Sequence, residues 1–141
     1  MTNKELVAAF FEEGYVKQNY DYLMKIMAAD YFDHSPAGAR TNQDCVDVLK
    51  GTAQSLSGMQ VEVLDLIEED SKVTVRAQFT ARHTGQMMGF APTGRVISFE
   101  ALEIFKVENG LITESWGYWP DLYIKKCLEG VDSWKNADLH A

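Results

Sequence analysis

Four ionisable side chains in largely apolar segments are the candidates for acid–base chemistry in this 141-residue sequence: Asp33, His34, His83 and Glu103. A carboxylate beside an imidazole could transfer protons, but adjacent strand residues point to opposite faces, so only one of Asp33 and His34 can enter a pocket. Histidine titrates near neutral pH, as a general acid or base at His83 would need to. Burial among apolar residues would raise the pKa of the Glu103 carboxyl by desolvation.

Each candidate also has a purely structural interpretation. Asp33 could cap the turn at Pro36, and both histidines could be packing residues with one satisfied nitrogen. Glu103 could instead pair with an arginine on a wet or dimeric sheet face, as could Glu100, which has the opposite strand parity. The residue types alone leave these alternatives open.

Aromatic and thioether side chains are the expected lining of a ligand pocket, because they offer large apolar contact with few polar groups. At helical or strand spacing the same side chains are commonly ordinary core. The substrate-binding candidates are Tyr15, Met88, Phe99, Trp116 and Tyr118.

Helical patterns fill the first 58 residues. Apolar residues at helical spacing predict an amphipathic helix over 3–18, begun by Thr2 or Asn3, and a short second helix over 20–29. A brief extended segment over 31–35 ends in a loop at Pro36. The stretch from Thr41 to Asp44 is close to a capping box and predicts a third helix that ends near residue 58.

After residue 58 the apolar period changes to two, which predicts strands over 61–67, 72–83, 95–107 and 111–119. Asn109 and Gly110 favour a type I′ hairpin turn between the last two strands. Helices followed by antiparallel strands indicate an α+β domain. We expect one strongly curved antiparallel sheet wrapped around the N-terminal helices.

Composition narrows the classes of function. The formal net charge of −8, with 21 acidic against 13 basic residues, predicts no nucleic-acid partner. No apolar run is long enough to span a bilayer, so we expect no membrane partner and a cytoplasmic location. Two isolated cysteines, Cys45 and Cys127, and three scattered histidines match no metal spacing, so neither a metal nor another cofactor is expected.

Three segments resemble the SnoaL-like polyketide cyclases of the nuclear transport factor 2-like superfamily. Residues 30–36, DYFDHSP, resemble the D-Y-x-[DN]-H-x-P segment of that family. Residues 83–95, HTGQMMGFAPTGR, resemble its H-T-G-x-x-x-G-x-x-P-T-G-R stretch. The hairpin from Phe105 to Trp116 is similar to its I-F-R-x-x-[DN]-G-K-I-x-E-x-W signature.

The resemblance implies a cone-shaped fold over residues 1–130, followed by a C-terminal tail at 131–141, and a homodimer formed through the sheet. It also implies cofactor-independent aldol-type cyclisation or proton abstraction on a small apolar carbonyl compound in a deep pocket. Glu103 falls where the cyclases can carry His, and Trp116 and Tyr118 fall where an aromatic residue faces the cavity. Gly117 stands where they carry a catalytic Asp, so Gly117→Asp is expected to restore a carboxyl.

The alternative is a non-catalytic module that binds a small molecule or serves as a dimeric interaction partner. The two interpretations differ in one property of the pocket. An enzyme should hold at least one carboxyl or imidazole with a strongly shifted pKa, whereas a carrier has no need of one.

Overall fold

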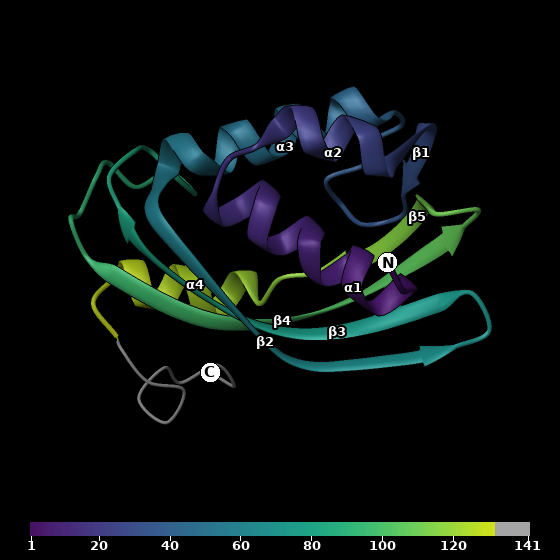
Figure 1. Cartoon of the computed structure of the whole chain (residues 1–141). Helices are drawn as coiled ribbons and strands as arrows, with labels where there is room; N and C mark the ends of the chain where they lie inside the picture. The colour runs from purple at the N-terminus through teal and green to yellow at the C-terminus, as the bar shows by residue number, and fades with distance from the viewer. Residues whose placement is uncertain (132–141) are drawn as a thin grey trace.

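The computed structural model of the protein describes residues 1–131 and shows an α+β fold in which helices cover one face of a single curved sheet (Figure 1). The helices are α1 (Asn3–Ala9), the π-helix η1 (Phe10–Val16), α2 (Tyr20–Ile26), α3 (Asn42–Ser55) and α4 (Asp121–Leu128). The strands are β1 (Met27–Asp33), β2 (Leu56–Glu69), β3 (Lys72–His83), β4 (Val96–Glu108) and β5 (Leu111–Tyr118). The tail expected at 131–141 lies, apart from Val131, outside the described residues.

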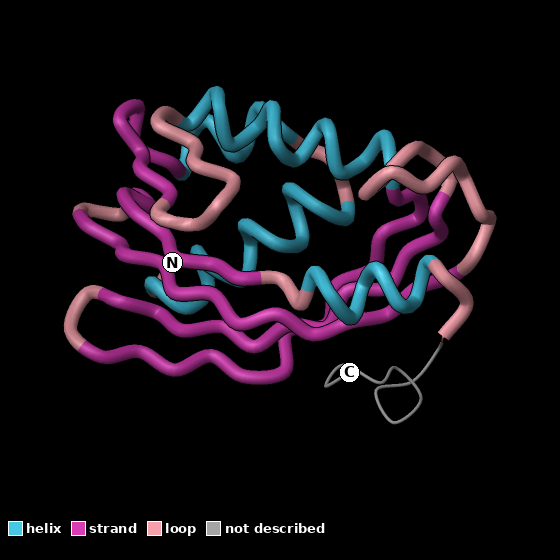
Figure 2. Tube along the Cα trace, turned by 180° about the vertical axis from the view of Figure 1, so that it is seen from behind, coloured by secondary structure: helices cyan, strands magenta, loops and turns pink. Residues whose placement is uncertain are grey.

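The sheet has the strand order β1-β5-β4-β3-β2. Its four long strands, β2 to β5, pair antiparallel as predicted, and β1 adds to the edge parallel to β5, so the sheet is mixed. Seen from behind, α4 lies along the sheet, where it packs against β4 (Figure 2). None of the helices within residues 1–131 is long and apolar enough to cross a membrane.

Side-chain caps fix where the first and third helices begin. Thr2 Oγ1 accepts a hydrogen bond of 3.1 Å from the Glu5 backbone N–H, and Glu5 Oε1 accepts one of 2.9 Å from the Thr2 N–H, which completes a capping box. Thr41 Oγ1 accepts from the Asp44 N–H at 3.0 Å at the start of α3. Both caps satisfy backbone donors that the first helical turn would otherwise leave unpaired.

The N-terminal helix changes register at Phe10, where a continuous α-helix was expected. From there the turns widen to a π-helix, and the Lys17 N–H donates to the Glu12 carbonyl oxygen five residues back at 2.9 Å. In an α-helix, residues five apart point about 140° away from each other. The wider turn instead brings Phe10 and Tyr15 to one side, with ring centroids 6.1 Å apart.

The core lies between the helices and the concave face of the sheet. Along β3 the odd-numbered residues are buried and the even-numbered ones are not, as the period of two predicted. Phe11 of η1 packs its ring 6.0 Å from that of Phe79 and 5.6 Å from that of Phe105, so the helix is held on the sheet by aromatic contacts. The space beyond these rings remains open as a cavity.

Candidate active site

A cavity of about 260 Å³ lies between the concave face of the sheet and the helices. The ends of β1 and β5, the middle of β4, and helices η1 and α3 contribute its walls. Most of the wall is apolar, with the aromatic rings of Phe10, Tyr15, Phe105 and Trp119 among its members. A concave, mostly apolar site with a few polar groups is the usual form of a small-molecule pocket.

Glu103 of β4 contributes a carboxyl to this apolar wall. Burial raises its pKa to about 8, and the nearby negative charge of Asp33 adds to the effect. Its Oε2 atom is buried and has no hydrogen-bond partner among the described residues. Glu103 is therefore protonated at neutral pH, and it can donate a proton to a molecule in the cavity.

Gly117 of β5 makes the room that Glu103 occupies. The two residues are direct partners in the β4–β5 ladder. A Cβ atom at position 117 would lie 2.5 Å from Glu103 Oε1, closer than such atoms approach in proteins. Gly117 thus leaves room for the Glu103 side chain, and Gly117→Asp would displace Glu103 rather than simply add an acid.

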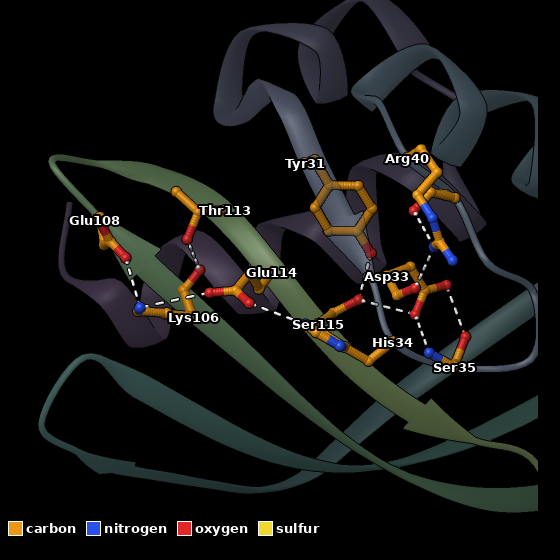
Figure 3. A network of polar contacts seen from close by, with 11 residues as sticks. Tyr31, Asp33, His34, Ser35, Arg40, Lys106, Glu108, Thr113, Glu114 and Ser115 are labelled. Atoms are coloured by element: carbon orange, nitrogen blue, oxygen red, sulfur yellow. Dashed lines mark hydrogen bonds and ion pairs between the residues drawn. The ribbon is translucent and has the colours of Figure 1, made fainter.

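Asp33 is held at the end of β1 by hydroxyl and backbone donors. Its Oδ1 accepts from the Ser35 backbone N–H at 2.8 Å and its Oδ2 from the Ser35 hydroxyl at 2.7 Å (Figure 3). The Ser115 hydroxyl donates to Oδ1 at 3.4 Å and also forms a short hydrogen bond with the Tyr31 hydroxyl. Asp33 and Ser115 meet because they are partners in the parallel β1–β5 ladder.

The phenol groups at the cavity are firmly protonated. Burial raises the pKa of Tyr31, and burial together with the charge of Glu103 raises that of Tyr15 well above its ordinary value. Burial likewise raises the pKa of the Cys45 thiol to about 12. These three groups are neutral at physiological pH and can serve only as hydrogen-bonding or packing groups.

Four of the nine site residues predicted from the sequence line this cavity: Asp33, Glu103, Tyr15 and Tyr118. Asp33 rather than its neighbour His34 faces the cavity. His34 lies on the other face of the sheet, where its ring stacks on Trp116 at 4.6 Å and its Nε2 lies 2.9 Å from Glu114 Oε1. Trp116 therefore does not line the cavity either.

Phe99 and Met88 also lie away from the cavity. Phe99 is buried in the core, with its ring 5.4 Å from Phe79 and 4.9 Å from Trp119. Met88 is exposed in the loop between β3 and β4, at a positive φ of 50°. The aromatic residue next to Phe99 that does line the cavity is Trp119, which the sequence pattern did not single out.

His83 is fully buried at the end of β3 and does not line the cavity. Its Nδ1 accepts a hydrogen bond of 3.1 Å from the Thr93 backbone N–H and lies 2.9 Å from the Thr93 hydroxyl. An Nδ1 that accepts leaves the proton of the neutral ring on Nε2, which is buried without a partner among the described residues. In this structure His83 anchors the loop over 84–95.

Sequence reasoning missed Tyr31 and Ser115, and a β-bulge in β5 explains the second omission. Lys106 pairs with Glu114 and Val107 with Ile112, so Thr113 is an extra residue in β5. Before the bulge, even-numbered Ile112 points inward; after it, odd-numbered Ser115 and Gly117 do. Trp116, which the family resemblance places facing the cavity, therefore points to the outer face, whereas Tyr118 lines the cavity as expected.

Within residues 1–131 no cluster of three or more His, Cys, Asp or Glu side chains is arranged to hold a metal ion. The polar groups of the cavity wall include three carboxyls, of Asp33, Glu103 and Asp121, and one hydroxyl network, and the rest of the wall is largely aromatic and apolar. This set can move protons and can hold an apolar molecule.

Several solved structures share this fold. IdmH, a proposed polyketide cyclase from Streptomyces antibioticus, is 23% identical, with 93% of this chain and 100% of that one covered and a TM-score of 0.82. A proposed SnoaL-like polyketide cyclase from Jannaschia sp. CCS1 is 18% identical, with 92% of each chain covered and a TM-score of 0.83. AclR, a proposed hydroxylase from Streptomyces galilaeus, is 22% identical, with 92% and 96% covered and a TM-score of 0.80.

No curated protein sequence gave a significant match to this chain. The model of one protein family, described as SnoaL-like polyketide cyclase, matches residues 5–126. Because this match spans most of the sequence and the fold agrees with it, the chain belongs to the SnoaL-like polyketide cyclase family.

Proposed function

We propose that the protein is an acid–base enzyme that abstracts a proton from a small, mostly apolar carbonyl compound, in an aldol-type cyclisation or a related reaction. The observation that carries this proposal is the protonated Glu103 carboxyl facing an apolar cavity within the electrostatic reach of Asp33. Two carboxyls that lie in different environments at one site can divide the roles of acid and base.

In the first step Asp33 is the base and Glu103 the acid. An Asp33 oxygen takes the proton from the carbon next to the carbonyl, and the C–H electron pair forms the carbon–carbon double bond of an enol. The carbonyl oxygen takes the Glu103 proton as its π bond opens. The Ser35 and Ser115 donors hold the Asp33 carboxylate in place before the transfer.

In a cyclisation the enol carbon then adds to a second carbonyl carbon of the same molecule. The second carbonyl oxygen takes the proton held by Asp33, and the enol proton returns to Glu103 as the first carbonyl re-forms. Both carboxyls end in their starting states. The aromatic walls would exclude water, which would otherwise protonate the enol.

The same site could serve a carrier, which is the alternative function. A carrier gains nothing from a carboxyl held neutral by burial, since a buried polar atom without a partner costs stability. Perturbed carboxyls in a cleft are typical of catalytic sites. The shifted pKa of Glu103 therefore favours a catalytic function over a carrier function.

Deuterium exchange of a simple ketone tests the first step without knowledge of the natural substrate. We expect the protein to accelerate exchange of the α-protons of 2-tetralone in D₂O, followed by NMR. Glu103→Gln and Asp33→Asn should each lower the rate by about 10²–10⁴-fold, the usual contribution of a positioned acid or base. Glu100→Gln, the same change on the outer face of β4, is the matched control and should leave the rate unchanged.

Two results would count against the proposal. One is a wild-type protein that binds ketones in the cavity but exchanges no proton faster than buffer. The other is an exchange rate that survives both cavity substitutions. The first result would favour the carrier function instead of catalysis.

We further propose a homodimer formed through the outer face of the sheet. Leu102 is 59% exposed there, and its direct partner in the β4–β5 ladder, Tyr118, which also lines the cavity, is 62% exposed. Ile104, the next residue of β4 on that face, pairs with Trp116. A contiguous apolar patch on a sheet face is the usual mark of a protein interface.

A further inference from the structure

We propose that the cavity selects ligands carrying a positively charged nitrogen, such as a protonated or quaternary amine, and rejects carboxylates. The inference concerns the same cavity as the proposed function but does not depend on that function, because an amine that ionises Glu103 would compete with a carbonyl substrate rather than take its place. Four features of the walls support it: their charge, their rings, the partners of Asp33, and an unsatisfied oxygen.

The ionisable groups of the cavity wall are acidic throughout. The carboxyls of Asp33, Glu103 and Asp121 line it, and no lysine, arginine or histidine is among the lining residues of the described chain. The phenols and the thiol at the wall are neutral. A carboxylate ligand would therefore enter an apolar space with a negative charge and no cation to pair with, which is the most costly arrangement for a buried ion.

Aromatic rings surround the same space. The ring centroids of Phe10 and Phe105 are 5.1 Å apart, and those of Tyr15 and Trp119 are 6.1 Å apart. The faces of such rings carry partial negative charge and attract ammonium groups, most strongly where water is excluded. Rings and carboxylates together favour a cation over a neutral molecule of the same shape.

Within residues 1–131, no lysine, arginine or histidine side chain pairs with the Asp33 carboxylate. Its hydrogen bonds come from Ser35 and Ser115, which are neutral. Arg40 lies close to this turn, but its Nη1 donates to the backbone carbonyl oxygens of Asp33, Gly38 and Ala39, and its guanidinium stacks 4.1 Å from the Phe32 ring. The charge of Asp33 is thus available to a ligand.

Glu103 Oε2 supplies an acceptor for a nitrogen-bound hydrogen. It is buried, and no donor among the described residues reaches it. A cation beside Glu103 favours the ionised carboxyl, so binding of an amine should release a proton to solvent at neutral pH. Asp33 and Glu103 together would then face one ammonium group.

Calorimetry with three ligands of nearly equal shape tests the charge preference. The ligands are benzylamine, benzyl alcohol and benzoate, titrated at pH 7 in phosphate and in Tris to count protons released. We expect benzylamine to bind at least tenfold more tightly than benzyl alcohol, and benzoate at least tenfold more weakly. Proton release should accompany benzylamine and be absent for benzyl alcohol.

Substitutions assign the preference to the two carboxyls. Asp33→Asn should reduce the ratio of benzylamine to benzyl alcohol affinity at least tenfold, and Glu103→Gln should remove the proton release. Circular dichroism spectra and cooperative urea unfolding that match wild type should show that both variants are folded. Glu100→Gln should change none of these values.

The proposal is overturned if benzylamine binds no better than benzyl alcohol, if benzoate matches the amine, or if the preference persists in both cavity variants. These binding outcomes are independent of ketone exchange. An active exchange catalyst without amine selectivity would refute only the charge preference, and an amine binder without exchange would refute only the catalytic role.

Discussion

Replacing Glu103 by glutamine should stabilise the protein, and by an amount that depends on pH. Glutamine has the same shape as a protonated glutamate and cannot ionise. The unfolded chain ionises Glu103 near its ordinary pKa of 4.5, whereas the folded protein keeps it protonated up to about pH 8. Between these values the folded wild-type protein loses stability as the pH rises, because only the unfolded state gains from releasing the proton.

The size of the effect follows from that window. Each pH unit within it is worth about 1.4 kcal/mol. Glu103→Gln should therefore leave stability unchanged near pH 4.5, raise it by about 3 kcal/mol at pH 7, and reach a limit of about 5 kcal/mol above pH 8. At roughly 3 °C per kcal/mol for a domain of this size, the melting temperature at pH 7 should rise by about 10 °C.

Urea denaturation followed by circular dichroism at pH 5, 7 and 9 measures this difference at a fixed protein concentration. The dependence of unfolding free energy on urea should be the same for both proteins, so that the midpoints report stability. Glu100→Gln is the control, because Glu100 forms an exposed ion pair with Arg76 at 2.6 Å that is worth little. A Glu103→Gln advantage that is constant between pH 5 and pH 9 would refute the burial of this carboxyl.

Three further predictions concern the neighbours of the site. Gly117→Ala should destabilise the protein by about 1–3 kcal/mol through its contact with Glu103. In a double-mutant cycle, adding Glu103→Ala should recover most of that lost stability, and additive effects would contradict the contact. Leu102→Glu should convert the proposed dimer to a monomer, as measured by light scattering at micromolar concentration. Leu122→Glu, the same change at a similarly exposed position on α4, should leave the dimer intact. A monomeric wild-type protein would exclude the dimer. His83→Ala should speed amide exchange over residues 84–95 and leave ketone exchange nearly intact; loss of ketone exchange in a folded variant would restore His83 to the catalytic set.

Local patterns in the sequence predicted most of the fold. Caps and strand alternation are decided by neighbouring residues: the cap at Thr41 and the alternation along β3 are confirmed, and of the two candidates Thr2 and Asn3 the first helix uses Thr2. Asn109 and Gly110 adopt the positive φ angles, 52° and 76°, that their turn requires. The α+β class follows from the order of these elements.

Features that depend on distant contacts were not predictable in the same way. The second helix ends at Ile26 rather than near residue 29, because the next residues pair with β5, more than 80 positions away. The π-helix at η1 has the same residue types as an α-helix and differs only in hydrogen-bond register. Packing of its aromatic face against the sheet decides between the two.

The candidate site was predicted in part for the same reason. Glu103 lies on a long regular strand, so its parity placed it correctly in the cavity wall, and Asp33 entered as one of two adjacent alternatives. Trp116 was expected to face the cavity from the family resemblance, but a β-bulge at Thr113 reverses the alternation of β5 and turns Trp116 to the outer face. No local signal in the sequence marks that bulge.

The pairing of Glu103 with Gly117 also affects how the evolution of such a site is inferred from aligned sequences. The two positions face each other across one ladder step and compete for one volume, so a bulky residue at either requires a small one at the other. A carboxyl can then pass from one strand to the next by two substitutions while the cavity keeps its shape. If the two positions are compared separately among aligned sequences, the carboxyl is read as lost. If they are compared together as a cross-strand pair, the carboxyl is read as retained on the neighbouring strand.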